Sequence, residues 1–192
     1  MERLILGSTS SYRRALMERL RIPFATEAPH VNEDEVKQSE DNPMAVVKEL
    51  ASRKAQAVFD KHPDAIVIGS DQAVCLGTRL LDKPGNAFNA CIQLRELSGQ
   101  EHQLLTAVAI AHAGGLVEFV DITRLVMREL TDSQIERYVQ ADEPFQCAGS
   151  YKIEGLGVTL FERIDGRDHT AIIGLPLLQL CNELRQIGVD LP

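Results

Sequence analysis

The sequence predicts an α/β protein in which a mixed, twisted sheet is flanked by helices. In the N-terminal third, short apolar runs alternate with segments of helical spacing, which is typical of strand–helix–strand order. The run from Ala65 to Val74 is almost continuously apolar, as expected for a central strand buried on both faces. Two longer β-rich runs, Gln103–His112 and Leu116–Met127, are joined by Gly114-Gly115, which predicts an antiparallel pair.

The N-terminal elements follow from local signals. Leu4–Leu6 is an apolar run that ends in Gly-Ser-Thr-Ser, so we expect a strand, a polar turn and a helix whose N-cap is Ser10. Ile22–Ala28 has the pattern of a second short strand. Residues 31–43 are acidic and poor in large apolar side chains, which predicts a loop, and a helix from Pro43 to about Phe59 follows it.

The rest of the chain alternates in the same way. Polar Ser70, Asp71 and Gln72 interrupt the run of residues 65–74 just past Gly69, so we expect them at the end of a core strand. The remaining predicted elements are a hairpin through Gly77, helices near Ala87–Leu97 and Thr131–Gln140, strands near Thr159–Ile164 and Thr170–Ile173, and a closing helix that begins with Pro176 and ends before Gly188.

Length and composition fit one domain. The chain has 192 residues, of which 44% are hydrophobic, enough for one sizeable core or two small lobes. We expect a single domain over residues 1–192 that has room for two lobes around a cleft. No internal repeat, linker or low-complexity tract suggests an independent second domain.

The charge balance argues against two classes of partner. With 20 Lys and Arg against 28 Asp and Glu, the formal net charge is −8 and the pI is about 5.1. Such a chain repels phosphate backbones and anionic membrane surfaces overall. We therefore expect no nucleic-acid and no membrane partner, and an anionic substrate would need local cations or a metal ion.

Cysteine spacing and the N-terminus favour the cytoplasm. The four cysteines form no C-x-x-C motif and no dense disulfide pattern. The only apolar run near the N-terminus, Leu4–Leu6, is too short for a signal peptide, and no later stretch is long enough to span a membrane. We expect a soluble cytoplasmic protein.

Several catalytic signatures are missing. The chain has no G-x-x-x-x-G-K-[ST], G-x-G-x-x-G, H-E-x-x-H or G-x-S-x-G motif. This disfavours phosphate-loop NTPases, Rossmann dehydrogenases, zincins and serine hydrolases. The chemistry must come from polar residues scattered over strand–loop and strand–helix junctions.

The first such group is G-S-T-S-S-Y-R-R at residues 7–14. Small hydroxyl side chains such as Ser8 and Ser10, with a helix N-terminus, present several donors to one spot, and Arg13 adds a fork of N–H groups. Together they could hold a di- or triphosphate. An ordinary serine-capped helix with solvated arginines explains the same pattern.

The second group is the pair of carboxylates Glu33 and Asp71. Both are of the type that binds Mg²⁺ while leaving coordination sites for water and phosphate oxygens, and one could instead act as a general base. Solvation explains the neighbouring Asp34 and Glu35. It explains Asp71 poorly, because a charge that follows A-I-V-I-G-S must be paired or metal-bound if it is buried.

Two lysines form the third group. Lys54 lies on the otherwise apolar face of its helix, and Lys83 lies in the D-K-P-G turn. Either ammonium could neutralise phosphate charge in a transition state. The alternatives are that Lys54 extends its ammonium group past the apolar surface into solvent, and that Lys83 is a solvated residue of its turn. His102 and Thr106, at the start of a strand, are weak signals.

In order along the chain, these pieces resemble the Maf-like family of nucleoside triphosphate pyrophosphatases. No single motif is specific, but eight occur in register over nearly the whole chain. They are S-T-S-x-x-R at 8–13, Glu33, L-A-x-x-K-A at 50–55, I-G-S-D-Q at 68–72, K-P at 83–84, H-x-x-x-T at 102–106, A-G-S-Y at 148–151 and G-L-P-L at 174–177.

The resemblance implies an α/β fold similar to the inosine triphosphate pyrophosphatases, with a cleft between two lobes. It also implies cleavage between the α and β phosphates, dependent on Mg²⁺ or Mn²⁺, giving a nucleoside monophosphate and pyrophosphate. On that pattern Asp71 is the proton acceptor for the attacking water and, with Glu33, a metal ligand. The positions that match phosphate contacts or metal support are Ser8, Ser10, Arg13, Glu33, Lys54 and Lys83.

Three positions make the chain resemble the branch of the family that hydrolyses 7-methyl-GTP. Branches acting on dTTP and UTP carry Arg, Thr and Gln where this chain has Tyr12, Gln72 and Glu154. N7-methylation makes guanine a cation that still has N1–H and N2–H donors. An aromatic face at Tyr12 suits such a ring, and a carboxylate at Glu154 can accept from both donors.

The chain departs from the pattern in places. Ser11 stands where the family often has Pro, and Tyr12 stands where the branch usually has Trp. Asn32 stands where the family has Asp, so one acid is lost from the metal loop.

Two alternatives stay open: the same chemistry on dTTP, UTP or another modified nucleotide, and a non-catalytic nucleotide-binding regulator of cell division. Apolar strands such as Leu104–Ile110 could also form a homodimer surface.

Overall fold

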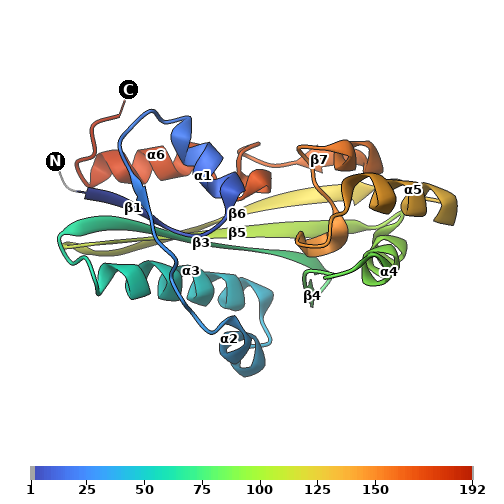
Figure 1. Cartoon of the computed structure of the whole chain (residues 1–192), viewed down its shortest axis with the longest axis horizontal. Helices are drawn as coiled ribbons and strands as arrows, with labels where there is room; N and C mark the ends of the chain where they lie inside the picture. Colours follow the sequence, from blue (N-terminus) through green and yellow to red (C-terminus); the bar gives the residue numbers. More distant parts are fainter. Residues whose placement is uncertain (1–2, 192) are drawn as a thin grey trace. The chain divides into compact units, whose positions relative to one another are not determined.

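The computed structural model describes residues 3–191 and contains a seven-stranded mixed sheet (Figure 1). Its elements are β1 (Arg3–Gly7), α1 (Ser11–Glu18), β2 (Ala25–Thr26), α2 (Glu33–Ser39), α3 (Pro43–Phe59), β3 (Ala65–Leu76), β4 (Arg79–Leu81), α4 (Ala87–Leu97), β5 (Glu101–His112), β6 (Gly115–Met127), α5 (Asp132–Asp142), η1 (Ala148–Ser150), η2 (Leu156–Leu160), β7 (Phe161–Asp165), η3 (Ala171–Ile173) and α6 (Leu177–Gln186).

The strand order is β2-β1-β3-β5-β6-β7, and β4 pairs with β3 off this path. β1 pairs parallel with β2 and β3, whereas β4 and β7 pair antiparallel with β3 and β6. The predicted class, an α/β protein with a mixed sheet and flanking helices, is therefore confirmed.

β1 and the first part of β3 are buried on both faces because their side chains alternate between two hydrophobic clusters. Leu6 and Ile68 pack with residues of α1 and α6, and Ile5 and Val67 pack with Val58 of α3. Successive side chains of a strand point to opposite faces, so double burial explains the nearly continuous apolar run in the sequence. In Figure 1, α3 lies on one side of these strands, and α1 and α6 lie on the other.

Two glycines let α3 lie directly against the strands. A Cβ added to Gly69 would come within 2.3 Å of the Ala51 carbonyl oxygen, and one added to Gly7 would lie 3.1 Å from that of Lys54. No side chain fits at the first of these positions. The backbone of α3 therefore approaches β3 closely, and the residues that follow Gly69 lie within reach of Lys54.

Contacts within the chain define two compact units. The first comprises the described residues up to 72, residues 106–121 and the described residues from 168 onward, and the second comprises residues 73–105 and 122–167. The first contains β1, β2, α1–α3 and α6, and the second contains β4, α4, α5 and β7. The single domain over residues 1–192 and the cleft stay predictions.

The predicted loop over residues 31–43 is wrong, because it contains helix α2. The helix begins with three acids, Glu33–Glu35, after Asn32, and acids in a first turn interact favourably with the helix dipole. Only Val36 of this helix is buried, so hydrophobic periodicity gave no signal.

Three strand predictions also change. Ile22–Ala28 yields only the two-residue β2, and Thr170–Ile173 forms a 3₁₀ turn instead of a strand. That turn forms because the Thr170 hydroxyl accepts from the Leu177 N–H at 2.9 Å, which folds the backbone back on itself. In β3 the ladder continues to Leu76, so Asp71 lies within the strand and not at its end.

Within the described chain, no helix is both long and apolar enough to cross a membrane.

Candidate active site

In the first unit, one lysine joins two carboxylates. Lys54 Nζ donates to Asp71 Oδ1 at 2.7 Å and lies 2.6 Å from Glu33 Oε1. The side chains of Lys54 and Asp71 are 9% and 12% exposed, and that of Glu33 is 44% exposed. The structure thus brings together three predicted residues from α2, α3 and β3, and excludes snorkelling as the explanation of Lys54.

The alternation of β3 explains this placement. Val67, Gly69 and Asp71 belong to the face that packs on α3, and glycine at 69 allows the close approach that Lys54 needs. Ser70 and Gln72 belong to the opposite face. Their partners are Gly174 and Ala171, both in the segment that leads into α6.

Arg13 is held by the same segment. Its Nε donates to the Gly174 carbonyl oxygen at 3.1 Å, and the Ser70 hydroxyl donates to the same oxygen at 3.1 Å. Burial lowers the pKa of Arg13, and the negative charges of Asp71 and Glu33 oppose that shift. An arginine keeps its proton in proteins, so a fixed cation faces the two carboxylates and has N–H groups left for phosphate.

The turn between β1 and α1 is organised by the hydroxyls of two serines, and of these the predicted N-cap is confirmed. Ser10 is the N-cap, and its hydroxyl accepts from the Arg13 N–H at 3.4 Å. Ser8 is buried, and its hydroxyl accepts from the Ser10 N–H at 3.2 Å. Each hydroxyl keeps a proton to donate, and the first amides of α1 form an electropositive helix end. Tyr12, in the first turn of α1, is 40% exposed.

Gln72 is held by its amide nitrogen. Its Nε2 donates to the Thr106 hydroxyl and the Ala171 carbonyl, both at 2.9 Å, and lies 3.3 Å from the Ile172 carbonyl. Thr106 in turn donates to the Ala171 carbonyl at 3.0 Å. Because these bonds use the amide nitrogen of Gln72, its side-chain carbonyl oxygen is the group that could accept a hydrogen bond from a ligand.

Sequence reasoning missed the residues that shape residues 168–178. Buried Asp168 accepts from the Thr170 N–H and hydroxyl at 2.8 and 2.6 Å, and from the Leu178 N–H at 2.7 Å. These bonds fix the carbonyls that hold Arg13 and Gln72. The sequence gives one signal for their role: two polar residues, Asp168 and Thr170, lie directly before an apolar segment.

Lys83 and Glu154 belong to the second unit, and both are exposed. The Lys83 turn is fixed by bonds from Gly85 N–H to Phe145 O and from the Gln93 amide to Asp82 O, at 2.9 and 2.8 Å. Burial raises the pKa of the Cys147 thiol, on which Glu154 and Lys83 act with opposite signs. Cys147 therefore lies within electrostatic reach of both residues.

The donor set fits a divalent cation that arrives with a triphosphate. Among residues 3–191 no three His, Cys, Asp or Glu side chains cluster as a metal cage. Glu33 and Asp71 supply two carboxylates that converge on one point, the Lys54 ammonium. Mg²⁺ is typically bound by one or two carboxylates plus substrate phosphates and waters, so two carboxylates are enough protein ligands for such an ion.

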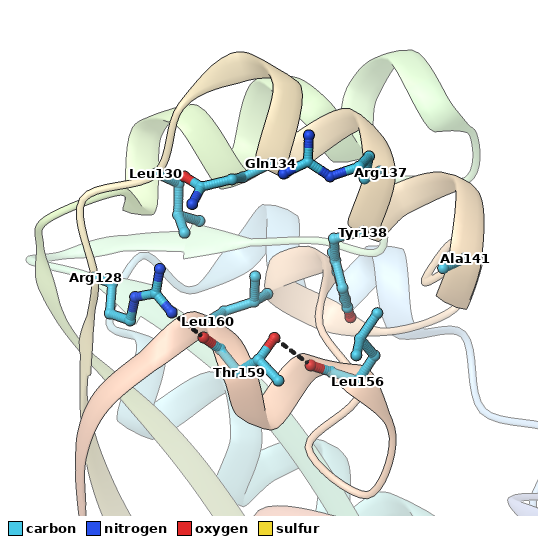
Figure 2. Close-up of a pocket in the computed structure, with 9 residues that line it drawn as sticks. All are labelled: Arg128, Leu130, Gln134, Arg137, Tyr138, Ala141, Leu156, Thr159 and Leu160. Atoms are coloured by element: carbon cyan, nitrogen blue, oxygen red, sulfur yellow. Dashed lines mark hydrogen bonds between the residues drawn. The ribbon is translucent and has the colours of Figure 1, made fainter.

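A pocket of about 380 Å³ lies in the second unit and contains none of the predicted site residues. Its lining includes Arg128 and Arg137, which donate to Thr159 O and Ser133 Oγ at 3.0 and 2.6 Å. Figure 2 shows these arginines and Tyr138 around apolar side chains. The full lining is Arg128, Leu130, Gln134, Arg137, Tyr138, Ala141, Leu156, Thr159 and Leu160.

Known proteins resemble the chain over its full length. A family model described as Maf-like protein matches residues 3–187. Proteins named 7-methyl-GTP pyrophosphatase from Chromohalobacter salexigens, Pseudomonas putida and Xanthomonas oryzae pv. oryzae are 42%, 43% and 45% identical to it. These matches cover 99%, 98% and 100% of this chain and 98%, 98% and 100% of the relatives.

Among solved structures, that of a HAM1 protein from Coxiella burnetii matches with a TM-score of 0.51 at 13% identity, over 97% of this chain and 100% of that chain. At this identity the match supports the fold alone.

Proposed function

Because this chain belongs to the Maf-like protein family, we propose that it is a metal-dependent nucleoside triphosphate pyrophosphatase that hydrolyses 7-methyl-GTP to 7-methyl-GMP and pyrophosphate. The observation that carries the chemistry is the buried Asp71 bonded to Lys54 beside Glu33 and Arg13. The substrate is supported by the full-length relatives of that name.

In this proposal the first unit binds the phosphates. The amides of the α1 N-terminus and the hydroxyls of Ser8 and Ser10 donate to phosphate oxygens. Arg13 and Lys54 neutralise the charge that accumulates on the departing pyrophosphate, and Lys83 is assigned the same task. The cations are needed because the chain as a whole carries a net charge of −8.

Asp71 is the proposed proton acceptor. A water oxygen forms a new bond to phosphorus as the anhydride bond between the α and β phosphates breaks, and the water proton passes to the Asp71 carboxylate. Lys54 holds Oδ1 of that carboxylate in place. Glu33 and Asp71 would hold Mg²⁺ or Mn²⁺, which supplies further charge neutralisation to the phosphates when bound.

Tyr12, Gln72 and Glu154 are the proposed base-reading residues. Tyr12 offers an exposed aromatic face to the cationic 7-methylguanine ring. Gln72 has its nitrogen bonded to the protein, so its oxygen accepts a donor from the base. Glu154 accepts from N1–H and N2–H and offsets the ring charge.

The proposal also includes the cytoplasm as the compartment, a small-molecule nucleotide as the partner, no nucleic acid, and a homodimer as the candidate assembly. The compartment and the absence of a nucleic-acid partner are supported by the acidic net charge and the cysteine pattern. The dimer surface expected at Leu104–Ile110 is wrong, because these residues are buried within the chain on a strand between β3 and β6, so a homodimer would need another surface.

The test is to incubate the purified protein and Mg²⁺ with 7-methyl-GTP, GTP, dTTP, UTP, CTP and ITP, and to measure pyrophosphate and orthophosphate separately. We expect pyrophosphate from 7-methyl-GTP well above all others, abolished by a chelator. Pyrophosphate mainly from pyrimidine nucleotides would keep the chemistry and overturn the substrate. No release from any nucleotide would overturn the enzyme and favour a binding regulator.

A further inference from the structure

Glu154 lies on a short, closed turn of the second unit. The turn is completed by a bond from the Gly155 N–H to the Lys152 carbonyl at 3.2 Å, and it connects η1 to η2. Glu154 and Gly155 are exposed, whereas Gly157, where the turn enters η2, is buried. An exposed carboxylate on a turn has a fixed direction only if the ends of that turn are held.

Both ends of the turn are held by the last part of helix α5. The Lys152 N–H donates to the Tyr138 phenol oxygen at 3.0 Å, and the Gly157 N–H donates to Asp142 Oδ2 at 3.2 Å. The Lys152 ammonium also donates to the Asp142 carbonyl at 2.5 Å. Tyr138 and Asp142 are four residues apart, so they project from one face of the helix.

Two glycines allow this close contact. A Cβ added to Gly157 would come within 2.3 Å of the Lys152 carbonyl oxygen, so no side chain fits there. A Cβ added to Gly155 would lie 3.1 Å from Asp142 Oδ2. Gly157 therefore lets the turn close against the backbone of Lys152, and Gly155 leaves room for the Asp142 carboxylate.

The supporting helix is itself well anchored. α5 begins with a capping box in which Thr131 and Gln134 bond each other's backbone, and Ile135 and Val139 are buried. Tyr138 is 3% exposed, and burial raises its pKa, so the phenol keeps its proton while it accepts from Lys152. In Figure 2 the Tyr138 hydroxyl points from α5 toward the segment that carries Leu156.

From this geometry we propose that Asp142 and Tyr138 are positioning residues for base selection, which hold the turn so that the Glu154 carboxylate meets N1–H and N2–H of the base together. The inference rests on the proposed function. A carboxylate that must accept two donors at once tolerates little displacement. A substrate whose base lacks that pair of donors does not depend on the turn in this way.

The test compares kcat/KM for 7-methyl-GTP with kcat/KM for UTP in Asp142→Ala, Asp142→Asn and Tyr138→Phe proteins. Tyr138→Phe removes the acceptor of the Lys152 N–H and should lower the ratio about fivefold, as for loss of one neutral hydrogen bond. We expect Asp142→Ala to lower the ratio about tenfold, as for loss of one charge-assisted hydrogen bond, mainly through KM for 7-methyl-GTP. Asp142→Asn, which keeps an acceptor for the Gly157 N–H, restores most of the ratio. Gln140→Ala, at an exposed position of the same helix, is the matched control and leaves it unchanged.

A second background separates positioning from general structural support. In a Glu154→Gln protein, Asp142→Ala should lower the ratio no further, because the two changes act on one interaction. Equal losses on both nucleotides, or additive effects of the two substitutions, overturn the proposal.

A readout that needs no turnover separates this inference from the proposed function. Amide hydrogen exchange at Gly157 should speed up in Asp142→Ala and stay as in the wild type in Gln140→Ala. Unchanged exchange in Asp142→Ala refutes the positioning role even if the enzyme is active. A wild-type protein that releases no pyrophosphate from 7-methyl-GTP refutes the proposed function, and with it the role in base selection.

Discussion

The two compact units hold their functional side chains in opposite ways. In the first unit Lys54 and Asp71 are nearly buried and bonded to each other. Lys54 lies on helix α3 and Asp71 on strand β3, and the two backbones approach closely at Gly69. In the second unit Lys83 and Glu154 are exposed, and what is fixed is the backbone of the turns that carry them.

This difference separates two kinds of mutational effect. A buried ion pair that loses one partner leaves an uncompensated charge in the core, so changes in the first unit affect turnover and stability together. A side chain on an exposed turn, such as Glu154, can change without disturbing packing. We therefore expect substitutions at Glu154 to change base preference while turnover chemistry and stability stay intact.

The largest expected effect comes from Asp71→Asn. An amide cannot take the water proton, so kcat should fall about 10³-fold, in the range of a lost general base. Glu33 still pairs with Lys54, so the far-UV circular dichroism should remain that of the wild type. Pyrophosphate release is the measurement, and Asp34→Asn, at an exposed acid of the same α2 helix as Glu33, is the control. A kcat within tenfold of the wild type would contradict the role of Asp71.

The next effect tests the close approach in the first unit. Gly69→Ala places a Cβ 2.3 Å from a backbone oxygen of α3, where Gly7→Ala meets one at 3.1 Å. We expect the free energy of unfolding to fall by about 3 kcal/mol for Gly69→Ala and about 1 kcal/mol for Gly7→Ala, as overpacking against backbone is costly. Urea titration measures both. Equal losses would show that α3 can shift away from β3.

Much of this first unit could be predicted from the sequence, for identifiable reasons. The alternating burial of β1 and β3 leaves an apolar run, Ser10 is a common N-cap, and Pro43 marks a helix start. A lysine on an apolar helix face and an acid in an apolar run each stood out in the sequence, but that they bind each other is shown only by the structure. Nothing local indicated that their partner Glu33 lies on a helix, because α2 buries only Val36.

The residues that support the site could not be found in the same way. Gly174 acts through its backbone carbonyl, which every residue possesses, so its identity carries little signal. The side chains of Asp168 and Thr170 bind backbone amides of residues 177 and 178, and nothing local in the sequence names those partners. The same holds for the Tyr138 and Asp142 contacts to the Glu154 turn, which join residues more than ten positions apart. Such contacts depend on tertiary packing, which the hydrophobic periodicity of a sequence does not reveal.

An intermediate effect is expected in the second unit as the pH falls. His102 is buried against Tyr151 and Phe161, and burial lowers its pKa from 6.5 to about 4. As the pH falls, the His102 imidazole takes up its proton at a higher pH in the unfolded chain than in the folded chain. The neutral, buried imidazole therefore contributes its full stabilisation above pH 6.5, and that contribution is lost as the pH falls toward 4. Between pH 7 and 5 this should reduce the free energy of unfolding by about 2 kcal/mol.

Denaturant titrations at the two pH values measure this loss, and the loss should shrink in His102→Gln. His169→Gln changes an exposed histidine and should leave the wild-type dependence intact. If His102→Gln retains the whole loss between pH 7 and 5, the titrating group lies elsewhere.

The smallest effect concerns Tyr12, which belongs to the first unit but is 40% exposed and so should behave like the turn residues of the second. Tyr12→Leu removes the aromatic face from a cationic base, and KM for 7-methyl-GTP should rise about fivefold, equivalent to about 1 kcal/mol of cation–π attraction. KM for GTP, whose base is neutral, should change much less, and the free energy of unfolding should stay within about 0.5 kcal/mol, as for other surface changes. Tyr12→Trp should strengthen the preference for the methylated base. If the leucine variant raises both KM values equally, Tyr12 contributes apolar contact alone, and the discrimination of the methyl group must come from the Glu154 charge.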